Sequence, residues 1–142
     1  MPEFRFVVDV MAPPQRVWET LVNVERWPEW TSSVTSVQQI EPGPLVLGSR
    51  VRIEQPELMT VVWRVTELDE RAGLFVWQTG RPGIKVIGSH RVQRAEGGSR
   101  VTLTLGYRGL LGWFMALQLK HLNWQYLEME AHGLKARSEG VR

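Results

Sequence analysis

The first 30 residues change their hydrophobic period from that of a strand to that of a helix. Residues 4–11 alternate apolar and polar side chains, which is typical of a half-buried strand. Two consecutive prolines follow, and because proline suits the first turn of a helix, we expect a helix over about residues 14–24. The Trp-Pro-Glu-Trp segment at 27–30 then indicates a short helical turn or a tight connection that carries two indoles.

The middle of the chain carries repeated strand signals. Six runs with strand-like patterns are separated by clusters of glycine or proline, which predicts an antiparallel meander. The expected strands cover residues 33–41, 49–55, 60–69, 73–79, 84–94 and 99–108. By alternation, the side chains expected on the inner face of this sheet are Val51, Ile53, Trp63, Val65, Phe75 and Trp77.

The register of the last hairpin follows from its pattern of polar and apolar residues. A four-residue loop at 95–98 pairs Val92 with Val101 and His90 with Leu103 on one face, and leaves polar pairs on the other. A slip of one residue would mix the two faces. We therefore expect His90 to point to the inner, apolar side of the sheet.

The C-terminal part of the chain has helical spacing and no proline from residue 110 to about 135. A single long helix is expected over this range, with Gly112 near its start and Gly133 near its end. At about 100° per residue, one stripe that can cover the sheet consists of Leu111, Met115, Leu119, Leu122, Tyr126 and Met129. A second apolar group lies almost opposite and needs another covering surface: Trp113, Leu117, Trp124 and Ala131.

The composition is that of one globular domain. The chain has 142 residues, close to the commonest domain size, and we expect a single domain over residues 1–137 with a short tail at 138–142. Zero cysteines exclude disulfides, thiolate catalysis and cysteine-bound metals. Only three histidines remain as nitrogen ligands, so neither a metal nor another cofactor is expected.

Charge and hydropathy narrow the classes of partner. The net charge is +2 and the basic residues are interspersed with acidic ones, whereas nucleic-acid binders normally gather basic residues on one face. The first residues lack the order of a signal peptide, and no apolar run approaches the roughly 20 residues that cross a bilayer. We therefore expect no nucleic-acid partner, no membrane span and a cytoplasmic location.

Several short segments carry a resemblance to a known family. They read Ala-Pro-Pro-Gln-Arg-Val-Trp-Glu at 12–19, Trp-Pro-Glu-Trp at 27–30, Leu-Gly-Ser-Arg-Val at 47–51, Trp-Arg-Val-Thr-Glu-Leu at 63–68, Leu-Phe-Val-Trp at 74–77, Gly-Ser-His at 88–90 and Gly-Gly-Ser-Arg-Val-Thr at 97–102. In this order they resemble the START-like (SRPBCC) superfamily, in its polyketide cyclase/dehydrase branch. The resemblance implies an α+β helix-grip fold, in which a curved antiparallel seven-stranded sheet wraps around a long C-terminal helix, with two short helices after the first strand.

The resemblance also implies a mostly apolar cavity between the sheet and the long helix, which is a usual place for a small hydrophobic ligand. Carried onto this chain, the mouth lies near Trp27 and Trp30. The sheet side of the wall contains Trp63, Phe75, Trp77, His90, Leu103, Leu105 and Tyr107. The helix side contains Leu111, Met115, Leu119, Leu122 and Tyr126.

Three residues of this implied cavity are candidates for chemistry. A histidine on an apolar wall can move protons near neutral pH, so His90 is the candidate proton carrier. Tyr107 or Tyr126 could orient a ligand carbonyl. The competing interpretations are a neutral histidine satisfied by a neighbour and tyrosines anchored to backbone, and the sequence places no carboxylate to orient His90.

Trp113, Leu117 and Trp124 on the second apolar group have three interpretations. They could pack on the short N-terminal helix, form a homodimer contact, or meet a membrane surface. The neighbouring Lys120, Glu128 and Glu130 carry mixed charge, which disfavours a lipid-binding face.

The function expected from these observations is binding of a small hydrophobic, ring-containing molecule in an interior cavity. Cyclase/dehydrase chemistry by metal-free acid-base catalysis is one extension of that function. The alternatives are a non-enzymatic carrier or sensor of a lipid or quinone, and a co-chaperone-like interaction module, because one fold hosts many functions.

Overall fold

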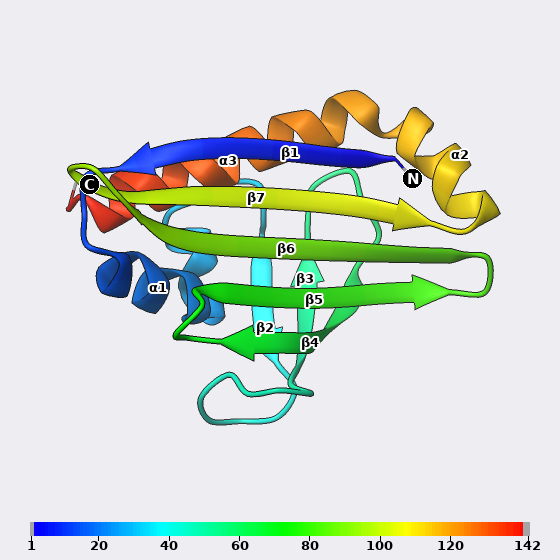
Figure 1. Cartoon of the computed structure of the whole chain (residues 1–142). Coiled ribbons are helices and arrows are strands. Elements are labelled where there is room, and N and C mark those ends of the chain that lie inside the picture. The colour runs from blue at the N-terminus through cyan, green and yellow to red at the C-terminus, as the bar shows by residue number, and fades with distance from the viewer. Residues whose placement is uncertain (1, 141–142) are drawn as a thin grey trace.

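The centre of the computed structural model, which describes residues 2–140, is a seven-stranded antiparallel sheet (Figure 1). Its strand order is β1-β7-β6-β5-β4-β3-β2, so the first strand of the chain pairs with the last. The strands are β1 (Glu3–Val10), β2 (Ser36–Gln39), β3 (Arg50–Glu54), β4 (Val61–Asp69), β5 (Leu74–Arg81), β6 (Ile84–Ala95) and β7 (Gly98–Arg108). Each of the seven expected strands is present within a few residues of its predicted bounds.

In the described residues, four helices accompany the sheet: α1 (Pro14–Val22), the 3-10 helix η1 (Val24–Glu29), α2 (Leu110–Gln118) and α3 (Lys120–Ser138). Figure 1 shows α1 at one end of the sheet, α2 at the other, and α3 running between these ends. The inward face of α1 is Val17, Trp18 and Leu21, as its spacing predicts. No helix within residues 2–140 combines the length and the hydropathy that crossing a bilayer requires.

The predicted register of the last hairpin is confirmed. His90 pairs with Leu103 and Val92 with Val101, and both apolar partners of these pairs are buried. In the neighbouring hairpin Val65 pairs with Trp77, with a bulge that follows Val65. The alternation of apolar and polar residues therefore selects the inner face of the sheet, and the helix-grip architecture expected from the sequence is the one observed.

The single long helix expected over 110–135 is wrong in one respect. Leu119 leaves helical geometry, with φ −104° and ψ 15°, so two helices meet there. Gly133 lies near the end of the second helix, as expected, and this helix continues to Ser138. A Cβ atom at Gly133 would lie 2.0 Å from the carbonyl oxygen of Trp30, so glycine is needed there because η1 and α3 approach closely. The expected tail begins inside α3 at Ser138, and its last residues, 141–142, lie outside the described part of the chain.

The inward face of α3 also differs from the predicted stripe. Ala131, which the stripe assigns to the outer group, is fully buried, whereas Leu111 is exposed. The break at Leu119 shifts the phase of α3 relative to α2, so a stripe drawn through one continuous helix selects only part of the inward face: Met115, Leu119 and Tyr126 reach the cavity wall, and Leu111 and Leu122 do not. The buried residues of α3 are Asn123, Tyr126, Leu127, Ala131, Leu134 and Ser138.

Candidate ligand cavity

A cavity of about 420 Å³ lies between the inner face of the sheet and the α2–α3 segment. This volume falls in the range of small-molecule sites, which are typically predominantly apolar with a few placed polar groups. On the sheet side its wall includes Trp63, Trp77, Val86, His90, Leu103, Leu105 and Tyr107. On the helix side the wall includes Met115, Leu119, Asn123, Tyr126, Leu127 and Glu130.

Two indoles form an aromatic part of the wall. The rings of Trp63 and Trp77 lie 5.5 Å apart at 30°, and Trp27 contacts Trp77 with 5.3 Å between ring centroids. Gly88 lies beside them, and a Cβ atom at this position would be 2.9 Å from Nε1 of Trp77. The absence of a side chain at Gly88 therefore leaves room for the rings, which offer flat apolar surface to a ligand.

The indole nitrogens of the cavity are not equally satisfied. Nε1 of Trp27 donates a hydrogen bond to the carbonyl oxygen of Leu21 at 2.9 Å. Nε1 of Trp63 is buried and has no hydrogen-bond partner within residues 2–140. Because a buried donor without an acceptor costs free energy, an oxygen atom on a bound molecule would stabilise this site.

His90 is buried and contacts a hydrogen-bond acceptor on each side of its ring. Its Nδ1 lies 3.0 Å from the carbonyl oxygen of Phe75, and its Nε2 lies 3.4 Å from Oε1 of Glu130. A carbonyl oxygen can only accept, so Nδ1 carries a proton. Nε2 is the ring nitrogen that faces the Glu130 carboxyl.

The contact between His90 and Glu130 is not a formed hydrogen bond. At 3.4 Å it is longer than a good N–H···O bond, and Oε1 of Glu130 is buried without a hydrogen-bond partner among the described residues. The Phe75 ring stacks on His90 with 4.6 Å between centroids and fixes the plane of the imidazole. The His90 imidazole and the Glu130 carboxyl therefore face each other, and both can still form a hydrogen bond with a third group.

The two tyrosines of the wall have different partners. Nδ2 of Asn123 donates a hydrogen bond to the Tyr107 hydroxyl at 2.9 Å, so the hydroxyl proton of Tyr107 remains available as a donor. Burial raises the pKa of Tyr107 and the hydrogen bond from Asn123 partly opposes this shift. The Tyr107 hydroxyl therefore stays protonated at neutral pH.

Tyr126 holds a loop over the cavity. Its hydroxyl donates a hydrogen bond to the carbonyl oxygen of Pro56, in the loop between β3 and β4. This loop contributes Gln55, Leu58 and Met59 to the cavity wall, and Met59 is exposed at its rim. Desolvation of the hydroxyl is the larger cause of a raised pKa of Tyr126, and the nearby negative charge of Glu57 is the smaller one. Tyr126 is thus anchored to the backbone, which is the alternative to a role in orienting a ligand carbonyl.

No cluster of three or more His, Cys, Asp or Glu residues that could hold a metal ion occurs in residues 2–140. The polar groups of the cavity are dispersed around an apolar wall, which is the arrangement of a site for an organic molecule.

A family model described as polyketide cyclase/dehydrase and lipid transport matches residues 1–139. The chain belongs to this family. The family description names both catalysis on polyketides and transport of lipids, and both activities require a site for a hydrophobic molecule.

Two solved structures show the fold that family members share with other proteins. The protein TTHA0849 of Thermus thermophilus superimposes with a TM-score of 0.78 and 21% identity, over 98% of each chain. The Zhui aromatase/cyclase of Streptomyces sp. R1128 also gives a TM-score of 0.78, with 16% identity over 97% of this chain and 93% of that one. At these identities the likeness establishes the fold alone.

Among sequence relatives, the uncharacterised protein Rv2574 of Mycobacterium tuberculosis is 25% identical over 119 residues. The match covers 74% of this chain and 65% of the relative, so this chain accounts for just under two thirds of the relative's length.

The structure brings ten of the fourteen sequence-predicted site residues into the cavity wall. They are Trp27, Trp63, Trp77, His90, Leu103, Leu105, Tyr107, Met115, Leu119 and Tyr126. The other four lie elsewhere. Phe75 is fully buried behind His90, Trp30 packs on Trp27, Leu111 is exposed against the β5–β6 turn, and Leu122 is half-buried on α3 outside the wall.

Among the features of the cavity that sequence reasoning missed are Asn123, Glu130 and the loop at residues 55–59. Asn123 and Glu130 are seven residues apart, which places them on one helix face together with Leu127. That spacing could have predicted a shared face for these residues, but a search for apolar stripes assigns a helix face with two polar residues to solvent. The loop gave no periodic signal at all.

Proposed function

We propose that this family member binds a small hydrophobic molecule that contains a ring and an oxygen acceptor. The observation that carries this proposal is the unpartnered, buried Nε1 of Trp63 in the wall of an apolar cavity. The Tyr107 hydroxyl, whose proton is available, supplies a second donor in the same wall. Apolar burial and contact with the indoles would supply most of the affinity, and the donors would orient the ligand.

The test compares two probes that differ by one oxygen. Naphthol and naphthalene are titrated into the protein and into Trp63→Phe, which keeps an aromatic ring and removes the N–H group. Losing one hydrogen bond should weaken naphthol binding by roughly threefold to tenfold and leave naphthalene binding nearly unchanged. The exposed Trp113→Phe variant serves as the control. Absence of measurable binding of either probe, or an equal loss for both, would refute the proposed mode of binding.

The His90–Glu130 pair favours a second candidate function, acid-base catalysis of a dehydration. In such a step the unprotonated Nε2 of a neutral His90 takes a proton from the carbon beside a ligand carbonyl, and His90 then returns this proton to the hydroxyl on the next carbon, which leaves as water. A C–H and a C–O bond break and a C=C bond forms, so no oxidant or metal is consumed. The pair supports this step because it places an imidazole and a carboxyl group beside each other in the wall of an apolar cavity.

A β-hydroxytetralone tests this candidate, because its dehydration gives a naphthol that is detected by absorbance. His90→Gln should lower the dehydration rate by about a hundredfold or more while naphthol still binds. Glu130→Gln should lower it as well, and the exposed His121→Gln variant should not. If naphthol binds but dehydration equals the uncatalysed rate, a non-enzymatic carrier or sensor of a lipid or quinone becomes the better description.

A further inference from the structure

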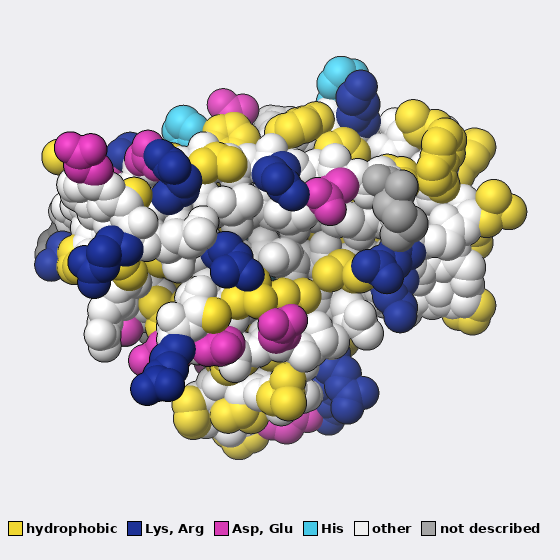
Figure 2. All heavy atoms as spheres, in the orientation of Figure 1, with side chains coloured by type: hydrophobic (Ala, Val, Ile, Leu, Met, Phe, Trp, Pro, Cys, Tyr) yellow, Lys and Arg dark blue, Asp and Glu magenta, His cyan; other side chains and the backbone are white. Residues whose placement is uncertain are grey.

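The large apolar side chains of α2 point away from the protein. Figure 2 shows hydrophobic side chains gathered at the end of the molecule that α2 occupies. Trp113 is 56% exposed and Phe114 is 63% exposed. Met115 also lines the cavity, so we call the other exposed apolar residues of this helix the α2 patch: Leu110, Leu111, Trp113, Phe114 and Leu117.

The helix packs on the protein through its smallest residues. Gly112 and Ala116 are the buried positions of α2, on the side that faces β6 and β7. This distribution is the reverse of that in an ordinary amphipathic helix, which buries its large apolar side chains. The core therefore does not require Trp113 and Phe114, and contiguous exposure of this kind marks an interaction surface.

Gly109 and the β5–β6 turn hold α2 in this position. Gly109 has φ +86°, and a Cβ atom there would lie 2.4 Å from the carbonyl oxygen of Gly83. The backbone N–H of Leu111 donates a hydrogen bond to the same oxygen at 3.0 Å. The first turn of α2 is thus fixed to the turn between β5 and β6, and the patch is a built part of the fold.

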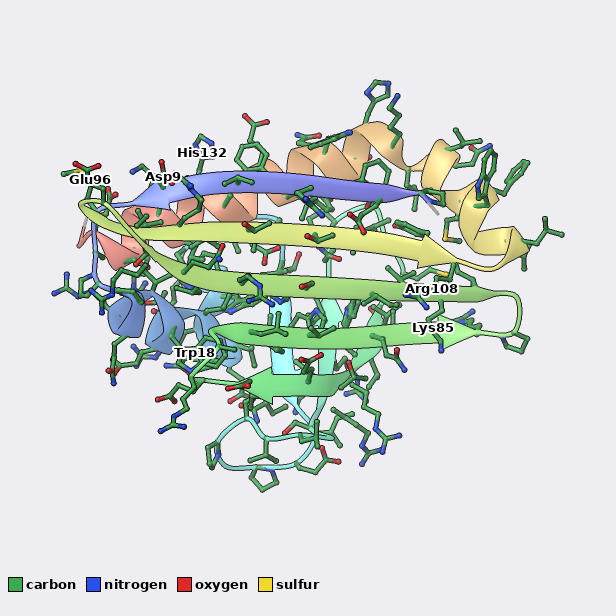
Figure 3. The ribbon with its side chains drawn as sticks, viewed as in Figure 1. Asp9, Trp18, Lys85, Glu96, Arg108 and His132 are labelled. Carbon is green, nitrogen blue, oxygen red and sulfur yellow. The ribbon has the colours of Figure 1, made fainter. Side chains whose placement is uncertain are left out.

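Exposed cations border the α2 patch. Arg81 and Lys85 flank the β5–β6 turn, Arg108 immediately precedes Gly109, and Lys120 follows the end of α2. Lys85 pairs in register with Arg108, and both lie at the α2 end of the sheet in Figure 3. Within residues 2–140 these four cations make no ion pair, whereas Arg100, Lys135 and Arg137 do elsewhere.

The acidic residues near this end do not neutralise the four cations. Glu3 is opposite Gly106 in the sheet but pairs with Arg5 at 3.2 Å. Glu130, which made the charge around the second apolar group look mixed, contacts His90 inside the protein. Glu130 therefore no longer counts among the acidic residues that argued against a lipid surface. Glu128, another of these residues, lies two turns of α3 beyond Lys120 and so does not lie beside α2.

We propose that the protein docks on an anionic lipid surface through the α2 patch. Trp, Phe and Leu on a protruding helix would enter the interfacial region of the bilayer, while the surrounding cations contact lipid headgroups. A second copy of the chain fits less well. A two-fold dimer brings the same surface of both copies together, so the unpaired cations around each patch would face one another.

The position of α2 connects this surface with the cavity. Met115 and Leu119 line the cavity, while Trp113 and Leu117 lie outside on the same short helix. A membrane contact through α2 would therefore place the cavity wall beside the lipid.

Vesicle flotation tests the proposal with two compositions: phosphatidylcholine alone, and an equal mixture of phosphatidylcholine and phosphatidylglycerol. The protein should float with the mixed vesicles and much less with the neutral ones. The double variant Trp113→Ser/Phe114→Ser should lower the affinity at least about tenfold, because both side chains are exposed in the free protein. The double variant Lys85→Gln/Arg108→Gln should lower it about thirtyfold at low salt.

Two matched controls separate this surface from general effects. Val46→Ser/Leu47→Ser removes exposed apolar side chains in the β2–β3 loop, and Arg71→Gln/Arg94→Gln removes the same charge at the far end of the sheet. Both controls should float like the unmodified protein, and circular dichroism should be unchanged in all variants. No flotation with mixed vesicles, or equal losses in the controls, would overturn the proposal. The proposal would also be overturned if vesicles do not bind and light scattering shows a dimer that the Trp113→Ser/Phe114→Ser variant dissociates. The α2 patch would then be the homodimer contact expected for Trp113, Leu117 and Trp124.

Discussion

Gly88 is a small residue with a large effect on the cavity. It lies in β6 opposite Leu105, and a Cβ atom there would lie 2.9 Å from Nε1 and 3.0 Å from Cδ1 of Trp77. The Trp77 indole is buried and contacts Trp27, Trp63 and other rings, so it cannot move without disturbing them. The glycine therefore fixes where the aromatic wall lies.

We predict that Gly88→Ala destabilises the protein by about 1–3 kcal/mol, because the added methyl group overpacks a buried site. The displaced Trp77 ring should also weaken naphthol binding. Urea denaturation and fluorescence titration measure the two effects. Gly106→Ala is the control, since no atom lies within 4 Å of its Cβ position. Equal stability of the two variants would contradict this account of Gly88.

His90 and Glu130 illustrate what a sequence can predict at the level of one residue. The face on which His90 lies follows from a period of two and a register that separates apolar from polar pairs. Glu130 lies on a helix, where a polar residue is normally assigned to solvent. Only the tertiary packing of α3 on the sheet brings its carboxyl to 3.4 Å from the imidazole. The histidine was therefore predictable, and its partner was not.

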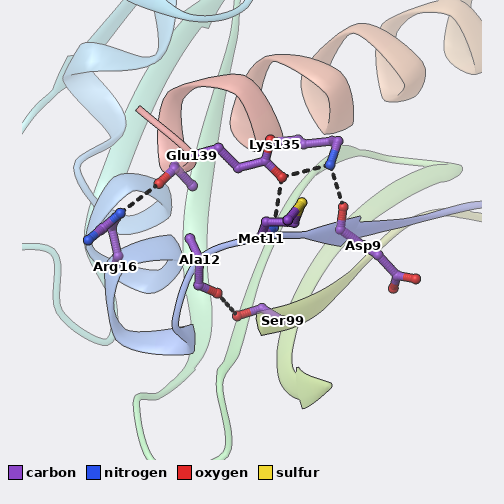
Figure 4. A network of polar contacts seen from close by, with 8 residues as sticks. Asp9, Met11, Ala12, Arg16, Ser99, Lys135 and Glu139 are labelled. Atoms are coloured by element: carbon purple, nitrogen blue, oxygen red, sulfur yellow. Dashed lines mark hydrogen bonds and ion pairs between the residues drawn. The ribbon is translucent and has the colours of Figure 1, made fainter. Parts of the chain in front are cut away.

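At the scale of elements, a group of polar contacts fastens the end of α3 to the segment between β1 and α1 (Figure 4). The Glu139 carboxylate accepts hydrogen bonds from Nζ of Lys135 and the backbone N–H of Met11, both at 2.7 Å. Lys135 also donates to the carbonyl oxygen of Asp9 at 3.0 Å. These contacts hold the C-terminal end of α3 across the sheet and so support the helix side of the cavity.

The charge of Glu139 should make this contact dependent on pH. The hydrogen bond from Lys135, followed by that from Met11, lowers the pKa of Glu139 in the folded protein. Folding thus favours the carboxylate, so its contribution is complete above the unfolded-state pKa and is lost as pH falls through the folded-state pKa. We predict that Glu139→Gln lowers the free energy of unfolding by less than about 1 kcal/mol at neutral pH.

Urea denaturation at a series of pH values checks this prediction. The difference between the unmodified protein and Glu139→Gln should shrink as acid protonates the carboxyl. Glu96→Gln, in the exposed β6–β7 turn, should change stability little at any pH. A difference that stays constant into acid would show that Glu139 acts through packing and not through its charge.

Elements differ in how far their bounds follow from sequence. The strands are bracketed by glycine or proline turns and alternate in polarity, so their positions were predictable to within a few residues. The break at Leu119 lies between Gln118 and Lys120 with no proline or glycine beside it, and local propensity gives no signal for it. Gly133 lies near the end of α3 as expected, but the reason for a glycine there could not be predicted, because it depends on contact with Trp30, which lies about 100 residues earlier in the chain.

At the scale of the whole molecule, the cavity lies between the curved sheet and the segment in which α2 meets α3. Ala131 and Leu134 pack fully against the sheet near one end, while Met115 and Leu119 face open space near the other. The volume left between them depends on side chains from the strands β3 to β7, the helices η1, α2 and α3, and the loops before β2 and between β3 and β4. Sequence patterns identify the faces that meet but contain no measure of the gap, so the volume of about 420 Å³ required the structure.

Filling this cavity should separate ligand binding from folding. Leu105 is a partly buried wall residue, and Leu105→Trp would place an indole in the open space. We predict that the free variant is at least as stable as the unmodified protein, because filling a cavity adds contacts without forcing the core apart. Naphthol at about a hundred times its dissociation constant should stabilise the unmodified protein by about 2.7 kcal/mol and Leu105→Trp hardly at all.

Thermal unfolding with and without naphthol measures this coupling. Leu111→Trp is the matched control, because Leu111 is exposed outside the cavity and the same substitution there should leave the ligand-induced rise in melting temperature intact. A folded Leu105→Trp protein with an undiminished rise would mean that naphthol binds elsewhere. A variant that loses stability without naphthol would mean that the space beside Leu105 is too small for an indole, and the weaker filling variant Leu105→Phe would then decide whether the cavity is the binding site.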